Sequence, residues 1–192
     1  MKQNNKLSII TLAAISIIAV GVFSITTNMD NIETQTNTSG MMVFNSYTTV
    51  DKNDMKKISE TILEGEIVDK YEILQYRDAN GEYVKEKSKK IAQTEPYIVY
   101  ELLTTEVMKN GKIDTDIVKF KTFGGNMNGI QVFTEVPSFE IGDKVVVLLE
   151  PALDGKHYEI TSGEFGIYKV TNGKAKNANS EISVKELKDS LR

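Results

Sequence analysis

The sequence contains no cysteine, no tryptophan and a single histidine in 192 residues. Without cysteine the chain has no disulfides, thiolate nucleophiles or thiolate metal ligands, which excludes transpeptidases that depend on a cysteine thiolate. One histidine is too few for an ordinary zinc site, which needs several His or Cys ligands. A Ser-His-Asp hydrolase would have to use His157, and no G-x-S-x-G motif is present. We therefore expect no catalytic residue, no cofactor and no metal.

Basic residues are also fewer than acidic residues. The formal net charge is -4, and without Lys2 and Lys6, which precede every acid, the remainder carries -6. A protein that binds the phosphate backbone of a nucleic acid needs a basic surface. The balance of charge predicts no nucleic-acid partner.

Charge is absent altogether from Leu7 to Ile25, a run of 19 mostly apolar residues. As a helix this run would span about 28 Å, close to the ~30 Å hydrocarbon core of a bilayer. Because Lys2 and Lys6 precede it, the positive-inside rule sends the following chain across the membrane. Two interpretations stay open, a retained membrane anchor and a cleaved signal peptide. A buried core helix lacks an apolar partner in the rest of the chain. We expect an extracytoplasmic protein, either anchored by this helix or secreted.

Composition divides the chain into segments of different character. The expected division is a cytoplasmic n-region at 1–6, a transmembrane or signal helix at 7–25, a linker at 26–50, a β-barrel domain at 51–170 and a polar tail at 171–192. The linker is rich in Asn, Thr, Ser and Met, with weak periodicity. In the tail, Ser183 and Glu186 have capping-box spacing, which predicts a short C-terminal helix.

The sequence of the expected domain has patterns that are typical of β-strands. Runs of β-branched and aromatic residues are separated by glycines and by Asn80-Gly81, a hairpin signal. In the strand near residue 120, Lys119 and Lys121 alternate with apolar residues and are expected to face water. The unalternated run Val145–Leu149 predicts a strand buried on both faces. The fold class we expect is mainly β: a small OB-like Greek-key β-barrel, with a short preceding helix and a C-terminal helix.

A set of turn residues carries a resemblance to a known family. The pattern is a strand ending in Gly-Gly, a Pro-x-Phe-x-x-Gly-Asp turn, an aliphatic run and a final G-x-x-G segment. The matching residues are Gly124, Gly125, Gly129, Pro137, Phe139, Gly142, Asp143, Gly163 and Gly166. This pattern resembles a family of exported bacterial and archaeal OB-like small β-barrel domains, mostly uncharacterised cell-envelope proteins. The resemblance implies the fold and no activity. The same residues suit barrel geometry better than a phosphate loop, with Phe139 closing one end of the barrel.

Function is less determined by the sequence than fold is. The candidate binding face consists of tyrosines that would stack on sugars or other flat groups: Tyr76, Tyr83, Tyr97 and Tyr100. The leading prediction is a non-enzymatic cell-surface module that binds an extracytoplasmic protein, a peptide or a wall glycan. One alternative is a hydrolase that uses paired carboxylates. Its candidate acids are Asp114, Asp116, Glu135, Glu140, Asp143, Glu150 and Asp154. Another alternative is a structural subunit of an envelope complex, with the helix near Leu187 as its contact.

Overall fold

The structure is a computed structural model that describes residues 51–109, 113–127, 130–132, 134 and 136–192. It also describes two short paired strands, β1 (Ala19–Val20) and β2 (Val43–Phe44). The predicted apolar helix at 7–25 otherwise lies outside the described residues, as do the n-region and most of the linker. In the described part of the chain, no helix is both long and apolar enough to cross a bilayer.

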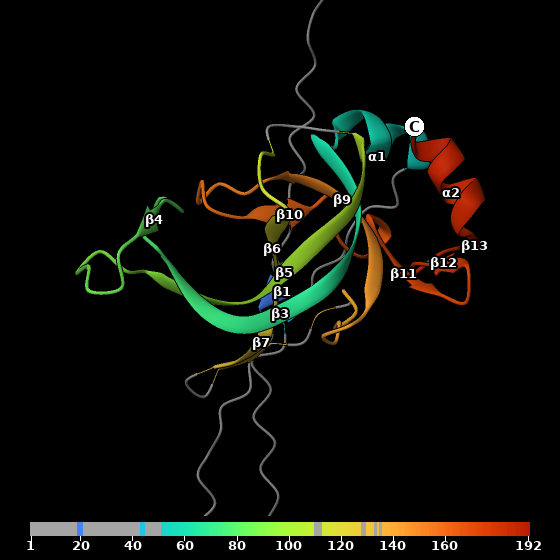
Figure 1. Ribbon diagram of the computed structural model, residues 1–192. Helices are drawn as coiled ribbons and strands as arrows, with labels where there is room; N and C mark the ends of the chain where they lie inside the picture. Colours follow the sequence, from blue (N-terminus) through green and yellow to red (C-terminus); the bar gives the residue numbers. More distant parts are fainter. Residues whose placement is uncertain are drawn as a thin grey trace, which may run out of the picture.

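The part of the chain that the structure describes is mainly β, and it ends in a helix, as predicted (Figure 1). The main sheet runs in the order β13-β12-β11-β9-β10-β6-β5-β3-β4. Its strands are β3 (Thr61–Arg77), β4 (Tyr83–Val84), β5 (Gln93–Lys109), β6 (Ile117–Phe123), β9 (Lys144–Pro151), β10 (Tyr158–Ile160), β11 (Ile167–Thr171), β12 (Lys174–Lys176) and β13 (Glu181–Ser183). A separate hairpin joins β7 (Gly125–Met127) to β8 (Ile130–Val132). The helices are α1 (Lys52–Ile58), α2 (Val184–Leu191) and the 3₁₀ turn η1 (Gly163–Phe165).

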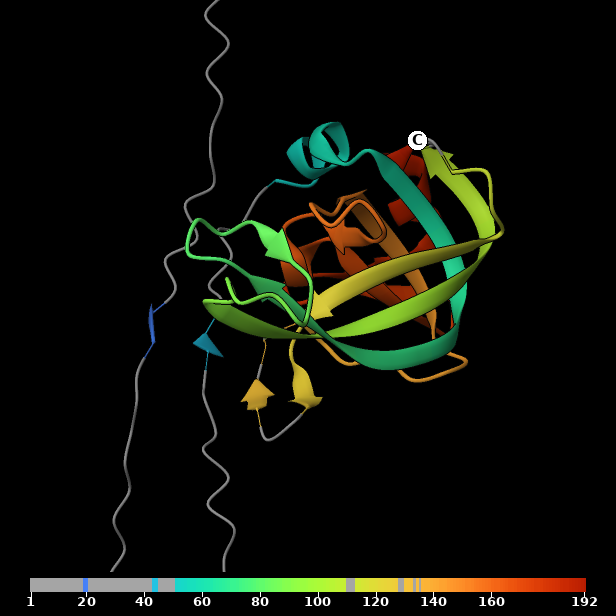
Figure 2. The same ribbon diagram turned by 90° about the vertical axis from the view of Figure 1, so that its left-hand side faces the viewer.

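Strand β9 has three partners in the sheet. It pairs antiparallel with β3, β10 and β11. In turn β10 pairs parallel with β6, β6 antiparallel with β5, and β5 antiparallel with β3. Starting from β3, the pairings β3–β5–β6–β10–β9 therefore lead back to β3 (Figure 2).

Strands β3 and β5 are long and curve together from the body of the protein to the loop that carries β4 (Figure 1). Their register shifts at three points, including one between Glu64 and Gly65. Such bulges bend a strand and increase its twist. At Gly65 a Cβ atom would lie 2.4 Å from the carbonyl oxygen of Leu103, so only glycine allows the two backbones to approach this closely.

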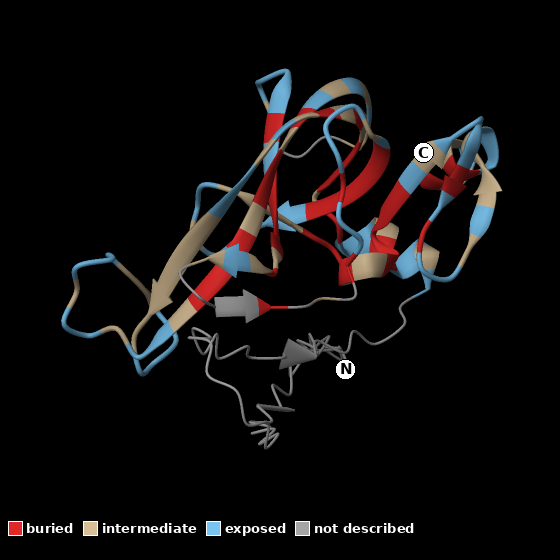
Figure 3. Cartoon of the chain, turned by 90° about the horizontal axis from the view of Figure 1, so that it is seen from below, coloured by how far each residue is buried: buried red, intermediate tan, exposed pale blue. Residues whose placement is uncertain are grey.

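Strand β9 separates two hydrophobic clusters, which explains its unalternated sequence. Val145, Val147 and Leu149 lie in one cluster with residues of β3, β5 and β6. Val146 and Leu148 lie in the other cluster, together with residues of α1 and α2. All five side chains are fully buried, as predicted for a strand covered on both faces (Figure 3).

The turn residues that carry the family resemblance occupy corners and contacts of the fold. Gly124, Gly125, Gly142 and Gly163 have positive φ angles, from 58° to 135°. The ring of Phe139 is fully buried and meets Tyr100 edge to face at 5.5 Å. Pro137 is exposed, Asp143 accepts the backbone N–H of Glu140, and Gly166 follows η1. Gly129 lies outside the described residues.

The tail is more ordered than its polar composition predicts. The capping box is present, with Ser183 Oγ accepting the Glu186 N–H, so the helix prediction is confirmed. Strands β12 and β13 were not predicted. The missed signal is Asn172-Gly173, whose φ angles of 52° and 76° make the tight turn into β12. Leu187 is fully buried in the second cluster, so its side chain is not a surface contact.

Candidate functional site

Lys121, a lysine near the middle of the sheet, is surrounded by polar and charged side chains. Lys121 lies on β6, and its side chain is fully buried. Its Nζ donates to Gln75 Oε1 at 2.6 Å and to the Tyr83 hydroxyl at 3.2 Å. Its ammonium group also lies 3.0 Å from Asp154 Oδ2 and 3.2 Å from Glu159 Oε1. Burial opposes the charge, but the hydrogen bonds to Asp154 and Tyr83 outweigh it and raise the pKa of Lys121.

Asp154, in the loop between β9 and β10, is the main acid of this cluster. Its Oδ1 accepts the backbone N–H groups of Lys156 and His157, and its Oδ2 accepts Gln75 Nε2 at 2.5 Å. His157 Nδ1 lies 2.8 Å from the same Oδ2. Burial opposes ionisation, but the hydrogen bonds from Lys156, His157 and Lys121 hold the pKa of Asp154 well below the usual aspartate range.

A second charged pair extends the cluster toward the long hairpin. Arg77 Nε binds Glu95 Oε2 at 2.9 Å, and Glu95 also accepts the Tyr97 hydroxyl at 3.0 Å. Arg77 also donates to the Tyr83 hydroxyl at 2.7 Å. The Tyr83 ring lies 4.1 Å from the Arg77 guanidinium carbon and 5.1 Å from Lys121 Nζ. Tyr83 therefore links the two charged pairs through its hydroxyl and its π-face.

Strand register explains why these groups meet on the sheet face opposite the first hydrophobic cluster. Directly paired residues share a face, and register places Tyr71, Val99, Lys121, Glu159 and Glu150 in one cross-strand row. The neighbouring row, which includes Tyr100 and Phe120, points into the first cluster. We name the groups on the opposite face the Lys121 cluster: Gln75, Arg77, Tyr83, Glu95, Tyr97, Lys121, Asp154, His157 and Glu159.

The four predicted binding tyrosines divide between surface and core. Tyr83 is half-buried in the Lys121 cluster, and Tyr97 is buried there with 7% exposure. Tyr76 is half-buried on the same hairpin. The prediction is wrong for Tyr100, which is fully buried and stacks on Phe120 at 5.3 Å. Alternation along a strand does not reveal which face is the interior when both faces carry aromatic residues.

The candidate acids of the hydrolase alternative are spread over several elements. Asp154 lies in the Lys121 cluster, and Glu150 lies directly opposite Glu159 across β9 and β10. Desolvation and the Glu159 charge raise the pKa of Glu150. Glu140 and Asp143 instead form ion pairs with Lys70 and Lys169. Glu135 lies outside the described residues.

Asp114 and Asp116 line a shallow hollow of about 270 Å³ at the end of β5 and β6. Its other walls are Thr104, Thr105, Glu106, Val107, Ile113 and Thr115. Among the residues that the structure describes, no group of three or more His, Asp or Glu side chains is placed to hold a metal ion.

No protein-family model matches the chain, and no curated protein matches it.

The electrostatics of the Lys121 cluster favour fixed charge over proton transfer. The pKa of Lys121 is raised and that of Asp154 is lowered, so each stays ionised near neutral pH. A general acid or base needs a pKa near the working pH, and a nucleophilic lysine needs a lowered one. The arrangement therefore suits binding through oriented charges, amides and rings.

Proposed function

We propose that the protein is an exported, non-enzymatic binding module whose ligand is a wall glycan. The observation that carries this proposal is the Lys121 cluster, where aromatic, amide and carboxylate side chains gather on the face opposite the hydrophobic core. Tyr71 extends that face at its exposed edge, with 37% exposure. Sugars bind to such combinations, because rings cover their C–H faces while amides and carboxylates take their hydroxyl groups.

The proposal includes an OB-like closed barrel of the exported cell-envelope family that the sequence resembles. It is supported by the pairing circuit β3–β5–β6–β10–β9–β3 with a single parallel pair, β6 with β10. OB-folds bind oligosaccharides and oligonucleotides on the face of their second and third strands, between the loop after the first strand and the loop before the last. The corresponding parts here are β5, β6, the β3–β5 hairpin and the β9–β10 loop. Apart from Glu159, which lies on β10, the residues of the Lys121 cluster come from these four parts.

Binding of a soluble β-1,4-linked N-acetylglucosamine oligomer by the purified full-length protein tests the glycan ligand. Tyr83→Ala should weaken binding by about tenfold, because a stacking ring at a binding site contributes about 1–2 kcal/mol. Tyr83→Phe keeps the ring and should retain most of the affinity. Tyr76→Ala is the matched control, since Tyr76 alternates with Gln75 and Arg77 and points to the other side of the hairpin. Calorimetric titration measures all four proteins.

The same mixtures distinguish binding from hydrolysis. Glu150 and Glu159 form the only described acid pair on this face with one raised pKa, which is the observation that favours the paired-carboxylate alternative. If the wild-type protein shortens the oligomers and the Glu150→Gln variant does not, the protein is a hydrolase, and the paired-carboxylate alternative replaces the binding proposal. Equal affinities of wild type and Tyr83→Ala for the oligomer would show that the glycan does not bind to this face.

Export is the other part of the proposal, and it rests on the uncharged run Leu7–Ile25 after Lys2 and Lys6. Mass measurement of the native protein in membrane and supernatant fractions tests it. A full-length mass in the membrane fraction identifies an anchored module, and a mass short of about the first two dozen residues outside the cell identifies a secreted one. A full-length protein confined to the cytosol would contradict export in either form.

A further inference from the structure

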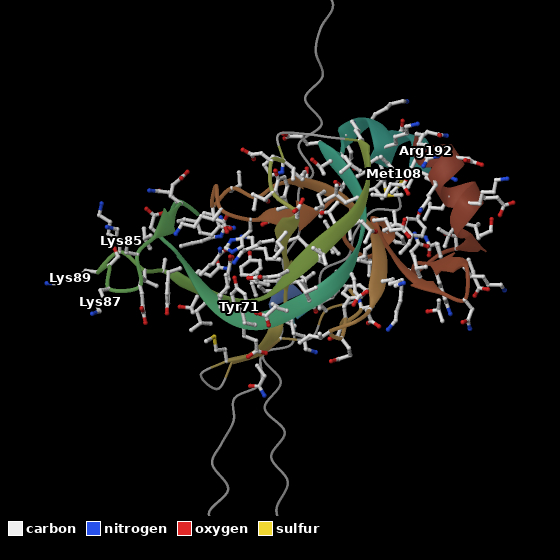
Figure 4. The ribbon with its side chains drawn as sticks, viewed as in Figure 1. Tyr71, Lys85, Lys87, Lys89, Met108 and Arg192 are labelled. Atoms are coloured by element: carbon white, nitrogen blue, oxygen red, sulfur yellow. The ribbon has the colours of Figure 1, made fainter. Side chains whose placement is uncertain are left out.

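The loop that returns from β4 to β5 carries the most concentrated positive charge of the domain. Residues 85–90, which we name the lysine loop, contain Lys85, Lys87, Lys89 and Lys90, and all four are exposed. Among the described residues, none of the four forms an ion pair. Figure 4 shows Lys85, Lys87 and Lys89 projecting outward at the end of the long hairpin, away from the body of the protein.

Hydrogen bonds hold the backbone of the lysine loop in place. The Ser88 N–H donates to the Lys85 carbonyl at 2.8 Å, and the Lys90 N–H donates to Ser88 Oγ at 3.2 Å. At the base of the loop, the Ala92 N–H donates to the Arg77 carbonyl at 2.8 Å. The single acid, Glu86, lies near Tyr76 on β3, where burial and then the Glu86 charge raise the pKa of the Tyr76 hydroxyl. The four ammonium groups are thus displayed from a backbone that is already ordered.

The charge of the lysine loop is opposite to that of its surroundings. Four lysines and one glutamate give the loop a formal charge of +3, whereas the whole chain carries -4, so the remaining residues carry -7. Charges separated by more than about 8–10 Å are screened at physiological ionic strength. Because the loop projects from the body, an anionic partner meets its positive charge before it meets the acidic remainder.

The side chains of the loop narrow the chemistry of that partner. Lysine is a flexible point charge that accepts phosphate groups without fixed bidentate geometry. The loop, residues 85–90, has no aromatic residue to stack on nucleic-acid bases. Residues 85–90 also contain no apolar side chain to enter a bilayer. We propose that the lysine loop binds a linear, phosphate-bearing polyanion. This site is separate from the proposed glycan face and does not depend on it.

Fluorescence anisotropy with labelled linear inorganic polyphosphate tests the proposal on the full-length protein in neutral detergent. Lys85→Gln/Lys87→Gln/Lys89→Gln should weaken binding at low salt by at least about tenfold. The slope of log affinity against log salt should fall from about -3 to about -1, at roughly -0.7 for each phosphate neutralised. Binding of the N-acetylglucosamine oligomer should be unchanged, so failure of one proposal is distinguishable from failure of the other.

A charge-matched variant separates the loop from bulk charge. Lys144, Lys176 and Lys185 are exposed and have no ion-pair partner among the described residues. Replacing these three by glutamine should change polyphosphate affinity by less than about threefold. An equal loss in both triple variants would overturn the proposal.

Two further probes test the identity of the polyanion. Tighter binding to an oligothymidylate of equal charge would overturn the assignment in favour of nucleic acid. The second probe is co-sedimentation of the protein with phosphatidylglycerol vesicles, with neutral vesicles as the control. The assignment would be overturned in favour of a membrane surface if the protein bound the anionic vesicles more tightly than polyphosphate and if this binding required Lys85, Lys87 and Lys89.

Discussion

Replacing Lys121 by methionine should lower the free energy of unfolding by about 3–5 kcal/mol, the usual cost of removing one partner from a buried charge pair. Methionine fills a similar volume, so the loss arises mainly from the charges left behind. Asp154 would keep its neighbours but lose its cation, and Glu159 would lose its partner as well. Urea unfolding at neutral pH, followed by circular dichroism, measures the change.

Lys119→Met is the matched control for this prediction. Lys119 lies two residues earlier on β6 and pairs with Glu101 at 2.6 Å, but its side chain is 46% exposed. Exposed ion pairs contribute about 0–1 kcal/mol, so this variant should lose less than about 1 kcal/mol. Equal losses in the two variants would show that Lys121 is not part of a tight buried network.

The difference in the free energy of unfolding between Lys121→Met and wild type should become smaller at acidic pH. The pKa of Asp154 is lowered in the folded protein, so its ionised form stabilises the fold above the unfolded pKa of about 4. That contribution is lost as the pH falls toward the folded pKa. The stability deficit of the variant should therefore be full between about pH 5 and 7 and should shrink below about pH 4.

Lys119 and Lys121 also show how far the sequence leads to the site. Alternation on β6 correctly places both lysines on the face opposite Phe120. It predicts water on that face for both, and this is wrong for Lys121. The groups that bury Lys121 come from Gln75, Tyr83 and Asp154, which lie 46, 38 and 33 residues away along the chain. No local pattern contains that information, because burial of this face depends on how the hairpin and the β9–β10 loop fold over it.

Features that depend on neighbouring residues were predicted more completely. The capping box at Ser183, the turn at Asn80-Gly81 and the buried run Val145–Leu149 all follow from local geometry or composition, and the structure contains each. The Asn80-Gly81 turn differs in detail, since only Gly81 has a positive φ. Strands β12 and β13 have three residues each, too few for alternation to stand out in a polar segment.

Gly166→Ala should be among the most destabilising single substitutions, with a loss of at least about 3 kcal/mol in the free energy of unfolding. The φ of Gly166 is -87°, so alanine meets no backbone strain there. The obstacle is contact, because a Cβ atom would lie 2.0 Å from the Thr161 carbonyl oxygen. Thermal and urea unfolding of the full-length protein measure the loss.

The neighbourhood of Gly166 cannot relax cheaply. The Thr161 N–H donates to the Leu148 carbonyl at 2.9 Å, and the Leu148 N–H donates to the Gly166 carbonyl at 2.8 Å. Both sides of the contact are thus fixed to the same residue of β9, which is buried in the second hydrophobic cluster. Separating them by more than 1 Å would break these bonds or shift β9 within its packing.

Gly173→Ala separates this contact from the general effect of replacing a glycine. Gly173 has a φ of 76° and no atom within 4 Å of a Cβ position, so its variant suffers backbone strain without a clash. That strain costs about 1–2 kcal/mol. A smaller loss for Gly166→Ala than for Gly173→Ala would contradict the close approach of η1 to β10. A larger loss for Gly166→Ala than for Gly173→Ala would show that the final glycine of the G-x-x-G pattern is required for packing and not for binding a ligand.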